Sequence, residues 1–168
     1  MSGIFREMRR KKQLLSLEDA IAVLERGTSG VLAVSGDDGY PYAVPLSYAY
    51  HGGKIFFHCA KSGHKLDAIA RNEKVSFCVI DRDTVVPEEY TTYFRSVVAF
   101  GKARVVEEDR EKRNALAILA ARYSPDHEQG RLREIEQQFS RVCVVELAVE
   151  HMTGKEAIEL ARDKASAQ

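Results

Sequence analysis

The sequence predicts a mainly β, α+β protein in which about six antiparallel strands form a barrel or a strongly curled sheet with peripheral helices. Short apolar runs of strand length are separated by turn signals such as "GDDGYP" and "HGGK". Helical segments do not alternate regularly with these strands, which disfavours a doubly wound parallel sheet. The chain has 168 residues, 45% of them hydrophobic, which suffices for the core of one domain.

The first third of the chain predicts one helix followed by three strands. "SLEDAIAVLERG" (residues 16–27) opens with a capping pattern and ends in glycine, so we expect a helix there. Residues 31–35, 42–50 and 55–59 read as strands joined by two hairpin turns. Three consecutive hairpin-linked strands predict an antiparallel meander.

The remaining elements follow from the same periodicities. We expect a helix over residues 62–72 with Ser62 as its N-cap, and then a strand over 74–81. Residues 81–89 are polar and contain Pro87, which predicts a loop. Two helices (109–123 and 131–139) and a weakly helical tail complete the helical elements, while the last two strands cover 90–108, with a bulge at Gly101, and 142–150.

Composition limits the classes of function. Lys+Arg and Asp+Glu both number 25, so the net charge is zero and no nucleic-acid or anionic-membrane partner is expected. Three cysteines without C-x-x-C spacing argue against a disulfide framework, and no metal centre is expected. No apolar run approaches the roughly 20 residues of a membrane span. The N-terminus lacks an apolar signal region, so we expect a cytoplasmic protein.

Three regions are expected along the chain. Residues 1–15 form a basic N-terminal arm, which includes "MRRKK" and reads as a solvated segment. Residues 16–155 form the folded domain, and residues 156–168 form a C-terminal tail. No linker, internal repeat or low-complexity segment divides the chain.

The segment "AKSGHK" places positive charge where a helix begins. Lys61, His64 and Lys65 lie at the positive end of the helix dipole, where cations are disfavoured and anions are favoured. Ser62 offers a hydroxyl, and Gly63 permits close approach to the backbone N–H groups. These features predict a phosphate site, because a bound dianion reverses the sign of the electrostatic term. The alternative is that the lysines are simply solvated.

Two further positions remain open on residue patterns alone. Pro45 interrupts a strand pattern and lacks the N–H of a ladder bond, which predicts an edge or a bulge. Such an edge is either ordinary or free to bond a flat heterocycle. Arg95 can pair with a phosphate, with Glu89 or with water, and spacing does not choose among these. The sequence contains no G-x-S-x-G, Walker or G-x-G-x-x-G motif.

Four segments taken together resemble the nitroimidazole-resistance (Nim) branch of the pyridoxamine 5′-phosphate oxidase-like proteins. They are "GVLAVSGDDGYPYAVPLSYAY", "KIFFHCAKSGHKLDAIARNEKVSFCVID", "YFRSVVAFGKARVVEE" and "HMTGK". The resemblance spans about residues 16–155. It implies an FMN-binding split β-barrel that works as a homodimer, with the flavin at the interface and in contact with both subunits.

The resemblance also implies roles for particular residues. Those expected along or near the isoalloxazine ring are Pro45, Leu46, Ser47, Ser96 and Val97, and those expected near the ribityl chain and phosphate are His58, Cys59, Ala60, His64 and Lys65. Ser62 joins the second group from its position at the helix start.

The expected activity is that of an FMN-dependent oxidoreductase that passes electrons to a small-molecule acceptor such as a nitroimidazole. His58 and His64 are candidate proton donors, and no catalytic residue is assigned. The tail "EAIELARDKASAQ" lacks the arginine–histidine arrangement of true pyridoxamine phosphate oxidases, which disfavours vitamin B6 oxidation. The alternatives are a non-catalytic flavin- or haem-binding protein on the same fold and a dimeric interaction module.

Overall fold

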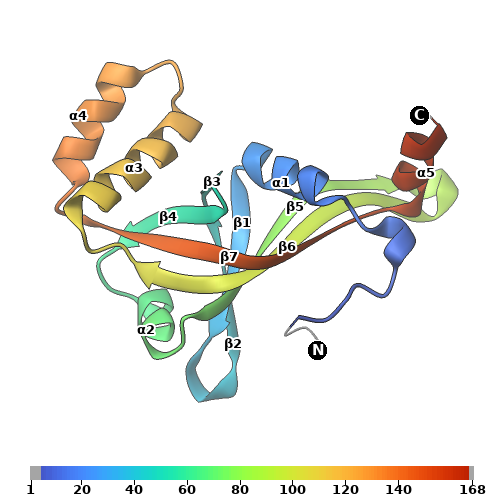
Figure 1. The fold of residues 1–168 in the computed structure, drawn as a ribbon, viewed down its shortest axis with the longest axis horizontal. Coiled ribbons are helices and arrows are strands. Elements are labelled where there is room, and N and C mark those ends of the chain that lie inside the picture. The colour runs from blue at the N-terminus through green and yellow to red at the C-terminus, as the bar shows by residue number, and fades with distance from the viewer. Residues whose placement is uncertain (1–4, 167–168) are drawn as a thin grey trace.

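The computed structural model describes residues 5–166, which form one antiparallel sheet flanked by helices (Figure 1). The strands are β1 (Ser29–Ser35), β2 (Pro41–Ser47), β3 (Ala49–His51), β4 (Lys54–Ala60), β5 (Lys74–Val86), β6 (Thr91–Val105) and β7 (Val142–Glu156). The helices are α1 (Leu17–Arg26), α2 (His64–Arg71), α3 (Asp109–Tyr123), α4 (Glu128–Gln138) and α5 (Ile158–Ser166). The first four residues of the predicted arm and the last two of the predicted tail lie outside the described residues.

The strand order shows why the sheet curls. The order is β2-β1-β5-β6-β7-β4-β3, so β2 and β3 occupy opposite edges although only Tyr48 separates them in sequence. Because one residue joins the two edges, the sheet must bend until they meet, and the result is a barrel split beyond that junction. The α+β split-barrel prediction is confirmed.

The predicted meander is wrong. β1 pairs with β2 and β3 pairs with β4, but β2 and β3 do not pair with each other and form two strands instead of the single one expected over residues 42–50. Hairpin turns were identified correctly, whereas the pairing of the two hairpins with distant strands was not. Local periodicity reports which face of a strand is buried and carries no information about its distant neighbour.

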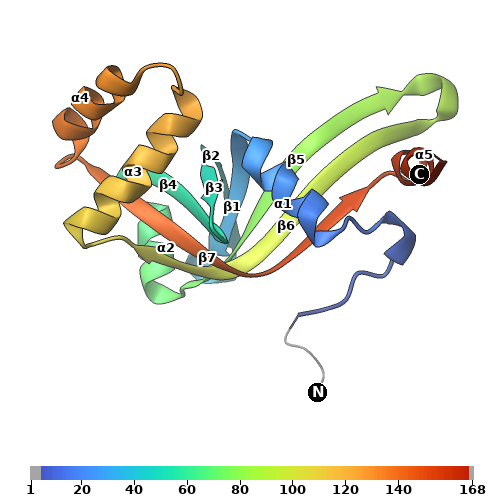
Figure 2. The ribbon, with the colours of Figure 1, turned by 45° about the horizontal axis from the view of Figure 1, so that its top comes forward.

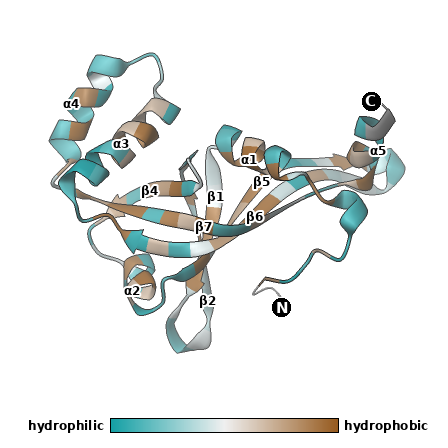
Figure 3. Ribbon diagram, viewed as in Figure 1, coloured by the Kyte–Doolittle hydropathy of each residue, from teal (hydrophilic) through white to brown (hydrophobic). Residues whose placement is uncertain are grey.

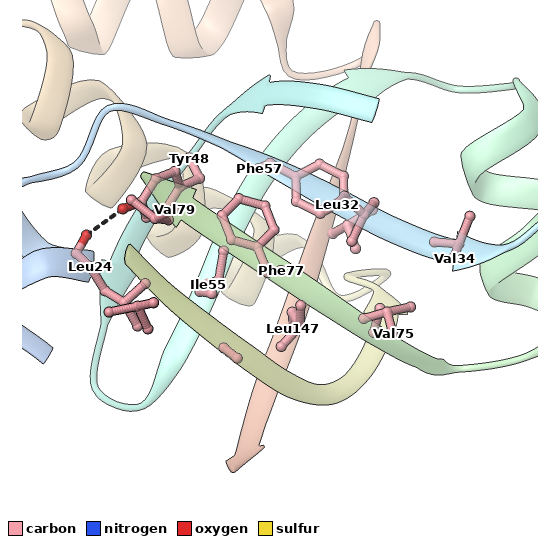
Figure 4. Close-up of a cluster of buried hydrophobic side chains, with 14 of the residues drawn as sticks. Leu24, Leu32, Val34, Tyr48, Ile55, Phe57, Val75, Phe77, Val79 and Leu147 are labelled. Atoms are coloured by element: carbon pink, nitrogen blue, oxygen red, sulfur yellow. Dashed lines mark hydrogen bonds between the residues drawn. The ribbon is translucent and has the colours of Figure 1, made fainter. Parts of the chain in front are cut away.

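Tyr48 holds the junction between the two edges. Its side chain is fully buried, and its hydroxyl donates to the carbonyl of Leu24 at 2.8 Å (Figure 4). Its backbone N–H donates to the hydroxyl of Tyr123 at 2.9 Å, and that hydroxyl also contacts the carbonyl oxygen of Thr28. The C-terminal ends of α1 and α3 therefore both fasten the junction.

The strands alternate between an inner and an outer face. The inner side chains, including Leu32, Phe57, Phe77 and Leu147, form the main core seen in Figure 4, and α2 covers it with Ala68 and Ile69. A second core forms outside the barrel, where α3 packs Leu116 and Leu119 against Phe56 and Val144. Apolar residues concentrate along the strands (Figure 3).

The predicted loop over residues 81–89 is largely strand. β5 continues to Val86 and pairs with β6 as far as Thr91, forming a two-stranded ribbon that projects from the barrel (Figure 2). A short turn at Pro87–Glu89 connects the two strands. Because both faces of such a ribbon are largely open to water, its sequence does not show the apolar alternation of a core strand.

The β6–β7 ladder is irregular at Gly101 as predicted, but the extra residue of the bulge is Glu150 of β7 rather than a residue of β6. The register with β7 shifts between Phe100 and Gly101, and a Cβ at Gly101 would lie 2.0 Å from the carbonyl oxygen of Ala148. Only glycine allows this approach of two backbones.

Further differences from the predicted boundaries lie in the last 41 residues of the chain and in the N-terminal arm. β7 extends to Glu156 rather than ending at residue 150, and α4 begins at Glu128 rather than at residue 131. The tail forms the helix α5. The arm is tied to the domain, since the N–H of Leu15 donates to the carbonyl of Gly154 at 2.9 Å.

Candidate functional site

The end of β4 and the start of α2 bring together six predicted residues, His58, Cys59, Ala60, Ser62, His64 and Lys65. His58 and Ala60 are exposed, and Cys59 is half-buried. The side chain of Cys59 points inward, like that of Phe57, and the side chain of His58 points outward, like that of Phe56. Successive residues of a strand point to opposite faces of the sheet.

Gly63, not Ser62, is the N-cap of α2. The backbone of Gly63 has φ 141°, and its carbonyl accepts from the N–H of Leu66 at 3.0 Å. Ser62 makes no capping hydrogen bond, so the prediction of Ser62 as N-cap and of a helix from residue 62 is wrong. The positive φ explains why Gly63 rather than Ser62 is the N-cap, because glycine adopts that conformation without strain and serine does not.

The start of α2 is open. A Cβ built on Gly63 would meet no atom within 4 Å. Lys61 and Ser62 on the preceding turn are exposed, and Lys65 is half-buried beside Cys59, where its charge lowers the pKa of that thiol against the larger upward effect of burial. The helix N-terminus thus has free space in front of it and two ammonium groups beside it.

His64 turns towards the β1–β2 hairpin. Its ring stacks on Tyr42 with a centroid separation of 4.1 Å, and its Nε2 lies 3.6 Å from Oδ2 of Asp37. Asp37 also accepts from Arg71 at 2.6 Å, and this hydrogen bond, followed by weaker attraction to His64, lowers the pKa of Asp37. The His64 ring therefore lies against Tyr42 and the Asp37 carboxylate of the β1–β2 hairpin.

The residues expected near the ring divide between the two faces of the sheet. Pro45 and Ser47 on β2 are exposed, and Ser96 on β6 is half-buried. Leu46 packs against the main core, and Val97 is fully buried within it. Side chains of Leu46 and Val97 therefore face away from the outer surface, and only their backbone can reach a ligand there.

The outer face of β2, β1, β5 and β6 forms a continuous row. Register places Pro45 opposite Val31, Val31 opposite Cys78, and Cys78 opposite Val98. β2 is an edge strand, so the prediction that Pro45 marks an edge is confirmed. The side chains of this row are small and mostly apolar, which suits contact with a flat ring system.

The two groups of predicted residues are only partly adjacent within one chain, because His64 stacks on Tyr42, three residues before Pro45 on β2, whereas Ser96 lies elsewhere on the sheet. Ala60 pairs with Val142 at the start of β7, whereas Ser96 pairs with Lys155 near its end. The intervening length of β7 corresponds to roughly 40 Å at about 3.3 Å per residue. Ser96 and the start of α2 therefore lie beside opposite ends of β7.

Arg95 is committed to carboxylates. Its guanidinium donates to Glu156 at 3.0 Å and to Asp81 at 3.2 Å, and neither carboxylate is the Glu89 partner that the sequence left open. Asp81 also accepts from Arg26 at 2.6 Å and 2.7 Å. The hydrogen bond from Arg26, with a smaller contribution from Arg95, lowers the pKa of Asp81 despite burial. This cluster fastens α1 to the β5–β6 ribbon.

The structure contains one groove that the sequence did not predict. It has a volume of about 710 Å³ and lies on the outer face beside the β1–β2 hairpin. Its lining includes Phe5, Ser35, Lys74, Ser76, Phe100 and Lys102, and none of the predicted site residues. Phe5 of the basic arm stacks on His151 at 4.7 Å, so this part of the arm lies on the sheet rather than in solvent. The outward positions of Ser76 and Phe100 were readable from strand alternation, but the arrival of Phe5 was not.

Other kinds of site find no support among residues 5–166. No group of three or more His, Cys, Asp or Glu side chains in that range is arranged to hold a metal ion. No helix in the described part of the chain is long and apolar enough to cross a membrane.

The profile of the pyridoxamine 5′-phosphate oxidase family matches residues 16–156. The chain belongs to this family. No curated protein matches the sequence. The match covers both groups of predicted residues, from β2 to the end of β7.

Several solved structures have the same fold. A candidate 5-nitroimidazole antibiotic resistance protein from Bacteroides thetaiotaomicron has a TM-score of 0.70 and 23% identity, over 85% of this chain and 86% of that chain. The flavocytochrome Anf3 from Azotobacter vinelandii has a TM-score of 0.77 and 18% identity, over 90% and 72%. An FAD and haem binding protein from Mycobacterium smegmatis has a TM-score of 0.72 and 24% identity, over 88% and 74%.

Proposed function

We propose that this protein binds FMN as a homodimer and acts as an oxidoreductase of the nitroreductase type on a small-molecule acceptor. The observation that carries the proposal is the open start of α2, where Gly63 faces free space between Lys61 and Lys65. Family membership and the likeness to a candidate nitroimidazole resistance protein support it.

The residues at this helix start fit a phosphate group. The first N–H groups of a helix have no intrahelical acceptor and can donate to phosphate oxygens. Lys61 and Lys65 add charge-assisted donors, and the exposed Ser62 adds a hydroxyl. Cations beside an empty helix N-terminus are electrostatically unfavourable, but the same cations become favourable once a dianion is bound there.

The position of Ser96, beside the opposite end of β7 from Ala60, supports a site shared by two subunits. One subunit would hold the phosphate at Lys61–Lys65, and its partner would place the outer-face row that includes Pro45 and Val98 against the ring. This arrangement would let one flavin contact both Ser96 and the helix start, although roughly 40 Å of β7 separates the pairing partners of Ser96 and Ala60 along the strand. The site is then incomplete in a monomer.

The protein would supply binding and orientation, while bound FMN supplies one- or two-electron transfer to the acceptor. His58 is the better candidate proton donor, because it is exposed whereas His64 stacks on Tyr42 beside Asp37. The odd number of cysteines supports the cytoplasmic location that we propose.

The visible spectrum of the purified protein tests the proposal. We expect flavin bands after purification or after titration with micromolar FMN, weaker binding of FAD, and a dimer by light scattering. Failure of FMN to bind, or tight binding to a monomer, would overturn the assignment. Nitroreduction is then followed with a reduced cofactor and a nitroimidazole.

The same spectrum separates the second candidate. A flavin- or haem-binding protein without turnover is suggested by the flavocytochrome and the FAD and haem binding protein among the similar structures. A haem Soret band, or bound flavin that reduces no acceptor, would favour it.

A further inference from the structure

Two thiols face each other across the β4–β7 ladder. Cys59 lies directly opposite Cys143, and both are free. Opposed residues of antiparallel strands project to the same face, with Cβ atoms about 4.5–5.5 Å apart. Burial raises the pKa of the Cys59 thiol, and the neighbouring Cys143 thiol raises it further. The two sulfur atoms are therefore close neighbours at the end of the barrel that α2 covers.

The register defines the geometry of this pair. The N–H of Val149 donates to the carbonyl of Gly53 at 3.0 Å, and alternate positions along the unbroken ladder lead to Cys59 and Cys143. The two cysteines thus occupy a hydrogen-bonded pair, for which Cα atoms are about 5.5 Å apart. That distance lies within the range of about 4.4–6.8 Å found for disulfides. The Cβ atoms must approach to about 3.8 Å, so the bond would be strained and readily reduced.

We propose that Cys59 and Cys143 form a redox-active dithiol that low-molecular-weight disulfides oxidise to an intrachain disulfide. Cys59 is half-buried and Cys143 is 9% exposed, so Cys59 reacts first. Its thiolate attacks the small disulfide, forming a mixed disulfide and releasing one small thiol. The Cys143 thiolate then attacks the Cys59 sulfur and releases the second small thiol. The protein loses two electrons, the small disulfide gains them, and the two thiol protons pass to the released thiols.

The location of the pair gives the bond a structural consequence. Cys59 lies one residue before the end of β4, where the chain turns through Lys61–Gly63 into α2. A bond to Cys143 at the start of β7 would draw this strand end towards β7. The proposed phosphate-binding segment is next to it, but formation of the bond does not require a bound flavin.

The third cysteine provides a matched control. Cys78 lies on the outer face of β5, opposite Val31 and Val98, and has no cysteine across either ladder. It is half-buried like Cys59, and burial likewise raises its pKa. It should therefore report general thiol oxidation without forming an intrachain bond.

The experiment is a peptide map of the full-length protein after incubation with oxidised glutathione and alkylation of the remaining thiols. We expect a cross-linked pair of peptides containing Cys59 and Cys143, an unlinked Cys78, and the same cross-link in Cys78→Ser. Cys143→Ser should stop at a glutathione adduct on Cys59. Reduced glutathione should restore the free thiols.

Two results would overturn the proposal. One is a wild-type map in which Cys59 and Cys143 are both alkylated after oxidation, and the other is a Cys59–glutathione adduct that does not resolve. Both are read from the wild-type protein, so they do not depend on the folding of a variant. They are also independent of the visible spectrum, and so a failure of flavin binding is distinguishable from a failure of the dithiol.

Discussion

Replacing Lys65 with alanine tests the proposed phosphate site most directly. The Lys65 ammonium has no ion-pair partner among the described residues, and its electrostatic neighbour is the Cys59 thiol. Lys65→Ala should therefore leave the fold intact and remove only the interaction with a bound phosphate. A hydrogen bond to a charged group contributes about 1.5–3 kcal/mol. The expected loss of FMN affinity is thus about 10- to 150-fold.

The assay is fluorescence titration of apo-protein with FMN, repeated with riboflavin, which lacks the phosphate. Lys65→Ala should weaken FMN binding and leave riboflavin binding unchanged. Lys12→Ala is the matched control, because Lys12 is an exposed lysine in a separate part of the chain, the short helix Lys11–Gln13. Unchanged FMN affinity in Lys65→Ala, or an equal loss for riboflavin, would refute the phosphate assignment.

Three further predictions follow from single contacts. Gly63→Ala should destabilise the protein by about 1–3 kcal/mol in urea unfolding, because φ 141° is strained for alanine, and should also weaken FMN binding; unchanged values of both would contradict the cap geometry. Tyr48→Phe should lower the free energy of unfolding by about 1–3 kcal/mol, because the buried Leu24 carbonyl loses its donor, and an unchanged urea midpoint would show that water replaces it. The pKa of Asp81 is lower in the folded protein than its ordinary value of 3.8, so the ionised carboxylate stabilises the folded state at pH values above 3.8. This stabilisation is lost as the pH falls through the lower pKa of the folded state. Asp81→Asn should therefore flatten the acid limb of thermal stability between pH 5 and pH 2, roughly the range in which a depressed carboxyl titrates, and an unchanged limb would show that Asp81 is not responsible.

The sequence by itself was sufficient for features that depend on neighbouring residues. The capping pattern before α1, the turns of the two hairpins, and the ladder irregularity at Gly101 were all predicted, because each depends on the conformational preferences of a few consecutive residues. The edge position of Pro45 followed for the same reason, since a missing N–H excludes a central ladder position. Four ordered segments also sufficed to predict the family.

Only the tertiary structure decided features that depend on distant pairing. The sequence did not show that β2 and β3 lie at opposite edges, that His64 stacks on Tyr42, or that Arg95 is held by Asp81 and Glu156. It also did not show that Cys59 faces Cys143, which are far apart in the chain, or that Ser96 and Ala60 lie at opposite ends of β7. Strand alternation specifies which face each side chain occupies, whereas partners and register follow from how the whole sheet closes around its core.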